Sequence, residues 1–290
     1  MEQQLIALYL RVCRAYDTEP DLKYQRLSNF KPRCTDEELV TMYLFGHMLG
    51  FRQQRRIYDY VRGHWRVWFP TLPSYQAFNR RLNRLVPAFE HLITVALSGQ
   101  VARLAEHSDR LIDSSPVVLA KWPRCAAARV AAELADQGFC SSKRSYYYGV
   151  KLHVIALRRA QQLPLPALLH LSRASQHDLT TMRELAPDLG GGYLFGDKAY
   201  ADERLKADLA GRGTYLVTPH KRRRNEPVTS TPALWSRFAS SVRQPLESLF
   251  GWLIQRTDIQ NASRVRSTKG LLVHCYGKLA VACLLLTFNS

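Results

Sequence analysis

Three acidic residues of this 290-residue chain stand where a charge is unusual. Asp113 interrupts the apolar run LIDSSPVV, Asp197 follows the run GYLFG, and Glu247 lies in RQPLESLFGWL, on the apolar side of a predicted helix. An unpaired carboxylate is costly to bury, so a lone acid in such surroundings is a candidate for chemistry. Carboxylates are the ligands that Mg²⁺ prefers, and two such ions about 3.5–4 Å apart promote phosphodiester cleavage and transfer.

Each acid also has a purely structural interpretation. Asp113 can belong to a turn that ends at Pro116, and Asp197 can cap a helix. Glu247 can form a salt bridge with Arg243, one helical turn earlier. Considered singly, no acid decides between these interpretations. Their occurrence together, on an early strand, at the end of a later strand and on a late helix, favours a shared site.

Strand-like segments begin at about residue 109. Apolar runs separated by turn residues predict five strands, at 110–120, 146–157, 165–174, 191–200 and 214–219. Helices are predicted after the third strand, with Asp178 as a capping residue, and after the fourth. This α/β order matches the ribonuclease H-like fold, a mixed five-stranded sheet flanked by helices, in which the first and fourth strands end side by side. The segment 219–240, rich in Lys, Arg, Pro, Ser and Thr, is expected to be a poorly ordered basic connector.

The first 105 residues show helical periodicity and no strand signal. Apolar spacing predicts helices at Gln4–Tyr16, Thr35–Gly50, Gln53–Trp65, Ser74–Val86 and Pro87–Ala105. Thr35 and Glu38 have the spacing of a capping box. We therefore divide the chain into an all-helical domain, 1–105, and a catalytic domain, 106–290.

One predicted helix of the first domain is strongly basic. It carries Arg80, Arg81 and Arg84 and follows a proline-containing turn, as the recognition helix of a helix-turn-helix does. These side chains suit phosphates and base edges, and we expect them to bind DNA. A solvated basic face is the alternative.

The charge balance of the whole chain indicates a polyanionic partner. Lys and Arg number 41 against 24 Asp and Glu, which leaves a net charge of +17. A membrane surface is disfavoured, because no run of about 18 apolar residues occurs. Six scattered cysteines without a paired C-x-x-C element argue against a zinc site and a disulfide scaffold and favour a cytoplasmic protein.

Several motifs extend these observations. The stretches LIDSSPV, KRSYYYGVKLH, FGDKAY, RQPLESLFGWL and RVRSTKGLLVHCYGKLAVACLL resemble DDE transposases of bacterial insertion sequences, in particular the insertion sequence 982 family. The resemblance implies a ribonuclease H-like catalytic domain in which Asp113, Asp197 and Glu247 bind two Mg²⁺ ions, with Mn²⁺ as a substitute and no organic cofactor. It also implies a helical domain that binds the double-stranded terminal repeats, a homo-oligomer of at least two copies on DNA, and action at the bacterial nucleoid.

The chain departs from one signature of several insertion-sequence families, a Tyr, Arg, Glu, Lys pattern around the last acid. Arg243 and Glu247 keep its spacing, but Ser240 and Ile254 stand at the Tyr and Lys positions. Other cations are therefore expected to contact DNA phosphate beside Lys198 and Arg243. The candidates are Arg256, Arg264, Arg266 and Lys269.

Two alternatives to a transposase stay open from the sequence. One is a ribonuclease H-like nuclease that cuts without joining, and the other is a DNA-binding regulator with a silent catalytic domain. Among the other residues, His153 and His170 are expected to pack or hydrogen-bond rather than bind metal. Trp122, Trp235 and Trp252 could stack on an unpaired base, although core packing is the simpler expectation.

Overall fold

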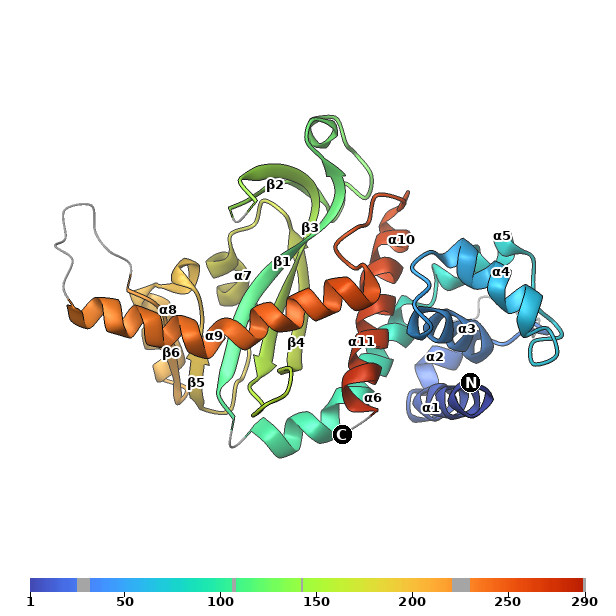
Figure 1. The fold of residues 1–290 in the computed structure, drawn as a ribbon, viewed down its shortest axis with the longest axis horizontal. Coiled ribbons are helices and arrows are strands. Elements are labelled where there is room, and N and C mark those ends of the chain that lie inside the picture. Colours follow the sequence, from blue (N-terminus) through green and yellow to red (C-terminus); the bar gives the residue numbers. More distant parts are fainter. Residues whose placement is uncertain (25–31, 106–107, 142, 221–229, 289–290) are drawn as a thin grey trace. The chain divides into compact units, whose positions relative to one another are not determined.

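The computed structural model describes the whole chain except residues 25–31, 106–107, 142, 221–229 and 289–290 (Figure 1). Its residues form two compact units. The helical unit comprises Met1–Ser98, Leu253–Ile259 and Val265–Ser290, and the sheet unit comprises Gly99–Trp252 and Gln260–Arg264. This grouping differs from the predicted division at residue 105, because the last helices of the chain belong to the helical unit.

The sheet unit contains the five predicted strands, although the fourth, predicted over 191–200, ends at Phe195, and it contains a sixth, short strand. They are β1 (Arg110–Lys121), β2 (Asp136–Cys140), β3 (Ser145–Leu157), β4 (Leu165–Arg173), β5 (Gly192–Phe195) and β6 (Thr214–Val217). The order is β2-β3-β1-β5-β6, with β4 also paired to β3. The pairs of β3 with β1, β2 and β4 are antiparallel, whereas β1–β5 and β5–β6 are parallel. This mixed sheet is compatible with the predicted ribonuclease H-like fold.

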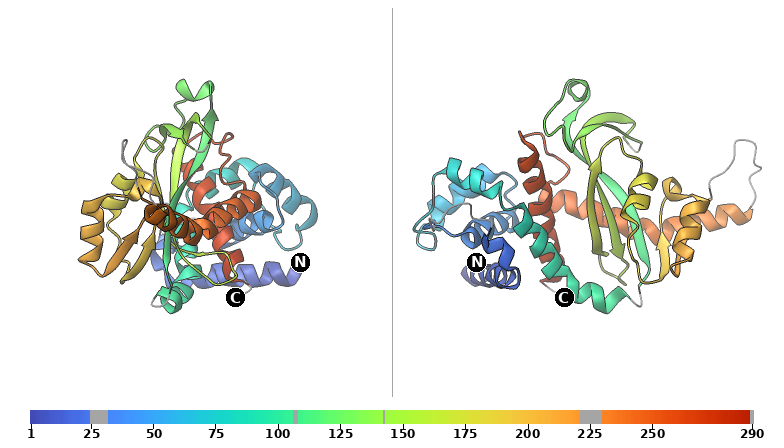
Figure 2. Two further views of the ribbon diagram at one scale, coloured as in Figure 1. Left: turned by 60° about the vertical axis from the view of Figure 1, so that its left-hand side comes forward. Right: turned by 180° about the vertical axis from the view of Figure 1, so that it is seen from behind.

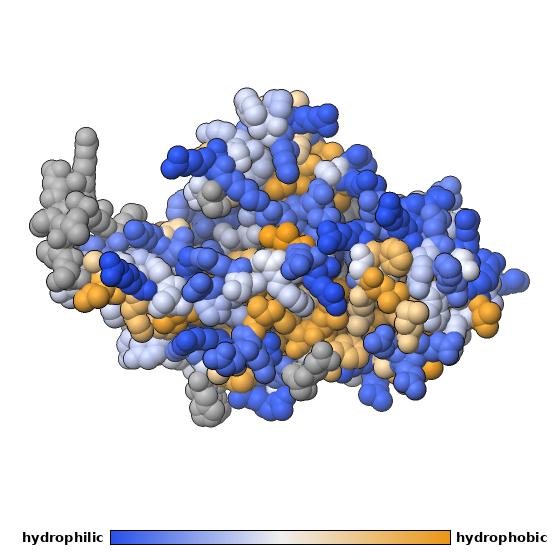
Figure 3. All heavy atoms as spheres, viewed as in Figure 1, coloured by the Kyte–Doolittle hydropathy of each residue, from blue (hydrophilic) through white to orange (hydrophobic). Residues whose placement is uncertain are grey.

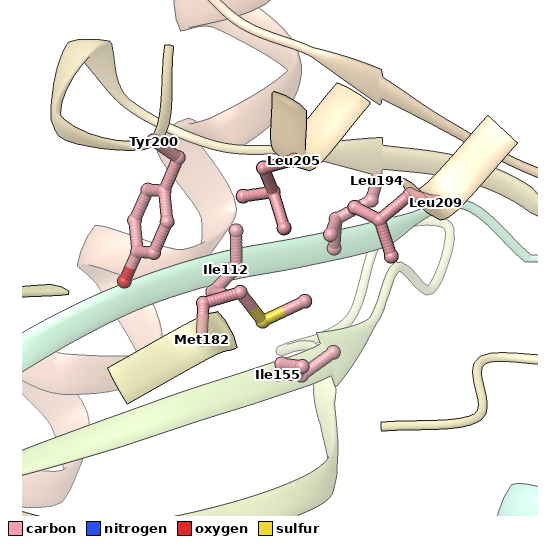
Figure 4. Close-up of a cluster of buried hydrophobic side chains, with 7 residues drawn as sticks. All are labelled: Ile112, Ile155, Met182, Leu194, Tyr200, Leu205 and Leu209. Carbon is pink, nitrogen blue, oxygen red and sulfur yellow. The ribbon is translucent and has the colours of Figure 1, made fainter. Parts of the chain in front are cut away.

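Helices cover both faces of the sheet (Figures 1 and 2). On one face, α7 (Asp178–Leu185) and α8 (Glu203–Ala210) enclose a cluster of apolar side chains that includes Ile112, Met182 and Leu194 (Figure 4). Successive side chains of a strand point to opposite faces, so the neighbours of Ile112 and Leu194 point to the other face. That face carries the long helix α9 (Ser230–Thr257).

The predicted connector 219–240 is wrong in its second half. Residues 221–229 lie outside the described residues, but α9 already begins at Ser230. Leu234, Phe238 and Val242 follow one another at four-residue intervals, which is the spacing of an apolar helix face. The helix therefore starts about ten residues earlier than the composition of this segment indicates.

The helical unit confirms the predicted helices of the first domain. Its elements are α1 (Glu2–Thr18), α2 (Pro20–Tyr24), α3 (Asp36–Met48), α4 (Gln54–His64), α5 (Tyr75–Leu82), the first part of α6 (Val86–Ala105), α10 (Thr268–Leu272), the π-helical turn η3 (Val273–Gly277) and α11 (Lys278–Thr287). The predicted capping box is present, because Thr35 Oγ1 accepts from Glu38 N at 3.2 Å and Glu38 Oε2 accepts from Thr35 N at 2.6 Å.

The C-terminal helices contact α3 within the helical unit. Gly277 lies so close to Tyr43 that an added Cβ would come within 2.6 Å of its ring, and the Tyr43 hydroxyl donates to Val273 O at 3.4 Å. By length and composition, Thr268–Thr287 is the one described helix that could cross a membrane, apart from the bent pair of α5 and α6. Because 67% of its apolar window is buried, it is a core helix of this unit.

Candidate active site

Asp113 lies on β1, on the sheet face that α9 covers. Ile112 points into the buried cluster on the opposite face, so Asp113 points toward α9. Its Oδ1 accepts from Ser114 N at 2.8 Å, and its Oδ2 accepts from Arg243 of α9. Burial raises the pKa of Asp113 to about 6, and the nearby charges of Asp197 and Asp178 add to the increase, although Arg243 and the Ser114 N–H lower it.

Asp197 lies directly beyond β5, the parallel neighbour of β1. The last paired residues of these strands are Leu111 and Phe195, so Asp113 and Asp197 each stand two positions further along. Asp197 caps the short 3₁₀ helix η2 (Lys198–Tyr200), because its Oδ1 accepts from Ala199 N at 2.8 Å. The sheet therefore places the two aspartates on neighbouring parallel strands, Asp113 within β1 and Asp197 just beyond the end of β5.

Glu247 is connected to Asp113 through a single arginine. The Arg243 guanidinium donates through Nη2 to Glu247 Oε1 at 3.0 Å and through Nη1 to Asp113. The Glu247 side chain is 61% exposed, whereas that of Arg243 is 16% exposed. The i,i+4 salt bridge considered from the sequence is thus present, and it extends to the acid on β1.

These acids do not form a ready-made metal-binding group. Across the described part of the chain, no three His, Cys, Asp or Glu side chains are arranged to hold a metal ion. The guanidinium of Arg243 instead lies between Asp113 and Glu247. The structure therefore connects two of the three acids through a cation and brings the third close enough to affect the pKa of Asp113.

Asp178 and Lys151 also belong to this region, and the sequence did not single out their pairing. Lys151 Nζ donates to Asp178 Oδ1 and to Gln176 O, both at 2.8 Å. The capping role expected of Asp178 is not observed, because His177 occupies the N-cap position of α7. The stretch KRSYYYGVKLH contained Lys151, but only the fold shows that it neutralises an acid next to Asp113.

Tyr200 is a further residue of this region that sequence reasoning missed. Its ring packs in the buried cluster, and its hydroxyl extends beyond that cluster (Figure 4). The hydroxyl is buried and has no hydrogen-bond partner among the described residues. Burial, followed by the charges of Asp178, Asp113 and Asp197, raises the pKa of Tyr200 well above its ordinary value. The motif GDKAY placed this tyrosine three residues after Asp197.

The cations predicted to bind DNA have different surroundings. Arg81 was expected to bind DNA, but its guanidinium donates instead to Asp36 Oδ1 at 2.5 Å and to Cys34 O at 2.8 Å. The largely buried Asp36 needs this counter-charge. Exposed cations are Arg80, Arg84, Arg256 and Lys269 of the helical unit and Lys198 and Arg264 of the sheet unit.

The structure confirms the packing role expected of His153 and contradicts the core packing expected of two tryptophans. His153 is buried, and its Nε2 lies 2.7 Å from Ser172 Oγ, so its expected packing role is confirmed. Core packing is wrong for Trp122 and Trp235, which are 66% and 47% exposed.

Comparison with known proteins identifies the family of the sheet-containing region. The family model described as "Transposase DDE domain" matches residues 105–268, more than half of the chain. That range contains all six strands, the whole of α9 and the three predicted acids. No curated protein and no solved structure matches the chain. On the family match, this chain belongs to the transposases with a DDE domain.

Proposed function

We propose that this transposase binds the ends of a bacterial insertion sequence, cleaves DNA there and transfers the freed strands into target DNA. Asp113, Asp197 and Glu247 would hold two Mg²⁺ ions, as the resemblance to the insertion sequence 982 family implies. The observation that supports this most strongly is the position of Asp113 on β1 and of Asp197 just beyond the end of its parallel neighbour β5, with Arg243 connecting Asp113 to Glu247.

The donor chemistry of these residues fits a hard divalent cation. All the proposed ligand atoms are carboxylate oxygens, which Mg²⁺ and Mn²⁺ accept. The raised pKa of Asp113 indicates that Arg243 does not fully compensate burial and the neighbouring negative charges. A bound cation would favour the ionised form of Asp113. The uncompensated negative charge around Asp113 would in turn favour binding of that cation.

Arg243 has a second role in this proposal. A cation that contacts both Asp113 and Glu247 needs the space in which the Arg243 guanidinium now lies. Once displaced, the guanidinium would pair with a DNA phosphate, which it can contact through two parallel hydrogen bonds. Lys198, exposed and adjacent to Asp197, provides a further cation for the same backbone.

The chain itself provides positioning and electrostatics for the reaction. Two divalent ions supply, in phosphodiester chemistry, activation of the attacking hydroxyl and neutralisation of the leaving oxygen. Asp113 accepts from Ser114 N and Asp197 from Ala199 N, so backbone N–H groups orient both carboxylates before the substrate binds. No serine or tyrosine nucleophile is required.

The helical unit would recognise the terminal repeats through α5. Arg80 and Arg84 are exposed on this helix or directly after it, whereas Arg81 is held by Asp36. At least two copies of the protein would bind the two ends of the element, in the bacterial cytoplasm at the nucleoid. These functions are proposals that rest on the family resemblance and on the exposed basic side chains.

The test is a strand-joining assay. Purified protein is incubated with Mg²⁺, a labelled terminal DNA that has already been cut, and a supercoiled plasmid, and joined products are separated on a gel. A transposase joins the label to the plasmid and cleaves flanked terminal DNA. Cleavage without joining would instead identify a nuclease, and intact DNA bound by the protein would identify a silent regulator.

A further inference from the structure

The sheet unit exposes aromatic side chains on the face that carries α9. Four of them are about half exposed: Tyr193 (54%), Tyr215 (56%), Trp235 (47%) and Phe238 (50%). We call these four residues the aromatic surface. Hydrophobic atoms are visible at the surface along the N-terminal half of α9 in Figure 3. Exposed apolar patches on proteins mark interaction sites.

The rings of the aromatic surface form a continuous path across two strands and one helix. Tyr215 on β6 lies 5.9 Å from Tyr193 on β5, measured between ring centroids. Buried Phe195 bridges the two halves, 6.4 Å from Tyr193 and 6.1 Å from Phe238. Phe238 in turn lies 5.8 Å from Trp235 on α9.

The local structure holds these rings in place. Leu194 packs in the buried cluster on the opposite face with Leu216 against it, so Tyr193 and Tyr215 must point outward as a cross-strand pair. Trp235 Nε1 donates to Thr218 O at 3.0 Å, which anchors the start of α9 to the end of β6. A rigid aromatic side chain binds a flat ligand with little loss of conformational entropy.

The aromatic surface lies on the same sheet face as the candidate active site. Asp113 and Phe195 both point away from the buried cluster, and their strands are paired neighbours. Helix α9 passes from Trp235 to Arg243 and Glu247 in little more than three turns. A ligand strand bound at the acids can therefore extend along this face.

Charge decides which ligand fits. The segments that carry these rings, 190–196, 211–220 and 230–242, contain Arg212 and Arg237 and no Asp or Glu, whereas the Arg243 that follows is already paired with Asp113 and Glu247. A second copy of the chain would present the same positive charge to this face, and like charges repel. A polyanion that also carries flat stacking groups is a nucleic acid with unpaired bases, because bases in a duplex stack on one another.

We propose that the aromatic surface binds unpaired bases of a DNA strand by stacking, beside the candidate active site. The inference deepens the proposed function, on which it rests for the identity of the nucleic acid as DNA. Stacking requires neither a metal ion nor cleavage, so it can be measured separately from the reaction.

The test compares strands with and without bases. Binding of a labelled oligothymidylate and of an abasic strand of equal length and charge is measured by fluorescence anisotropy, in EDTA. The wild-type protein should prefer the strand with bases. In the Tyr193→Thr/Tyr215→Thr variant, the ratio of the two affinities should fall by about 5- to 150-fold for each base that no longer stacks on a ring. Tyr193→Phe/Tyr215→Phe, which keeps the rings, should retain it.

A second exposed aromatic pair provides a matched control. Phe139 and Tyr146 are 53% and 52% exposed, and their ring centroids lie 5.0 Å apart on β2 and β3. Phe139→Thr/Tyr146→Thr should keep the preference for bases. Thermal unfolding checks the fold of each variant, and Trp235→Leu tests the helix side of the surface should the strand variants unfold.

Three results would overturn the inference. The first is equal binding of both oligonucleotides by the wild-type protein. The second is an unchanged preference for bases in both the Tyr193→Thr/Tyr215→Thr and the Trp235→Leu variants. The third is the absence of a base preference together with a concentration-dependent dimer in sedimentation that these variants abolish. A protein that joins DNA but shows no base preference would refute the stacking surface alone. A protein that prefers bases but neither cuts nor joins would refute only the proposed function.

Discussion

Two arginine–aspartate pairs, one in each unit, show how similar contacts serve different purposes. Arg81 with Asp36 and Arg243 with Asp113 are both short, and all four side chains are at most 20% exposed. The first pair is completed by the Cys34 carbonyl and holds α5 beside the start of α3. The second stands beside Asp197, Asp178 and Glu247. A matched pair stabilises a fold, whereas an excess of acids around one cation is the arrangement that the proposed metal site requires.

The largest expected effect concerns Asp113. Asp113→Asn should lower Mg²⁺-dependent cleavage and joining by on the order of 10³-fold or more, because the amide is a poor ligand for Mg²⁺ and carries no charge. Gel assays at saturating DNA measure the rate. Ser114→Ala is the control and should keep nearly full activity, since only its backbone N–H contacts Asp113. Equal losses in the two variants would contradict the assignment of Asp113.

The equivalent change at the other pair should act on stability. Asp36→Asn leaves Arg81 without its counter-charge in a largely buried position, which should lower the free energy of unfolding by about 3 kcal/mol. Urea unfolding followed by circular dichroism measures this change. The folded fraction should retain its cleavage rate, and a rate loss comparable to that of Asp113→Asn would remove the distinction between the pairs.

The pH dependence of stability should differ in the same way. The pKa of Asp113 is raised to about 6, so the folded protein binds this proton more tightly than the unfolded chain does. The stability contributed by protonated Asp113 is present at low pH and is lost as pH rises from about 4 to 6. Above pH 6, Asp113→Asn should therefore be more stable than the wild type, by at most roughly 3 kcal/mol. Urea unfolding at several pH values without metal would show it, and no gain at pH 7 would be the contrary result.

Tyr200 should produce a smaller change. Its buried hydroxyl lacks a hydrogen-bond partner in the described structure, so Tyr200→Phe should raise the free energy of unfolding by about 1 kcal/mol. Tyr43→Phe is a matched control, because that hydroxyl donates to Val273 O and its loss should not stabilise the protein. A destabilised Tyr200→Phe protein would indicate a partner that the structure does not include.

The smallest effect is expected on α5, where neighbouring arginines differ. Arg80→Ala should weaken binding to duplex DNA and lower the slope of log K against log salt by about 0.9, the value for one phosphate contact. Arg81→Ala should chiefly lower stability, because Arg81 is bound to Asp36. Anisotropy titrations over a range of salt concentrations measure the slope. An unchanged slope for Arg80→Ala would favour the alternative of a solvated basic face.

Local patterns in the sequence were sufficient for much of the fold. Five strands were predicted because alternating apolar residues and turn residues depend only on near neighbours. The capping box at Thr35 was predicted for the same reason, since its two partners are three residues apart. The motifs around Asp113, Asp197 and Glu247 also gave three candidate acids, whose role stays a prediction.

Contacts between distant residues were decided only by the tertiary structure. No local pattern pairs Arg243 with Asp113, which lies 130 residues away, or Lys151 with Asp178. The same holds for the contact between Tyr43 and Gly277, which brings the last helices into the helical unit. Burial of Tyr200 and exposure of Trp235 depend on which sheet face each side chain meets. The sequence alone therefore determined the elements and the candidate chemistry, whereas packing decided which charges neutralise one another, because electrostatic energies depend on distance in space and on burial.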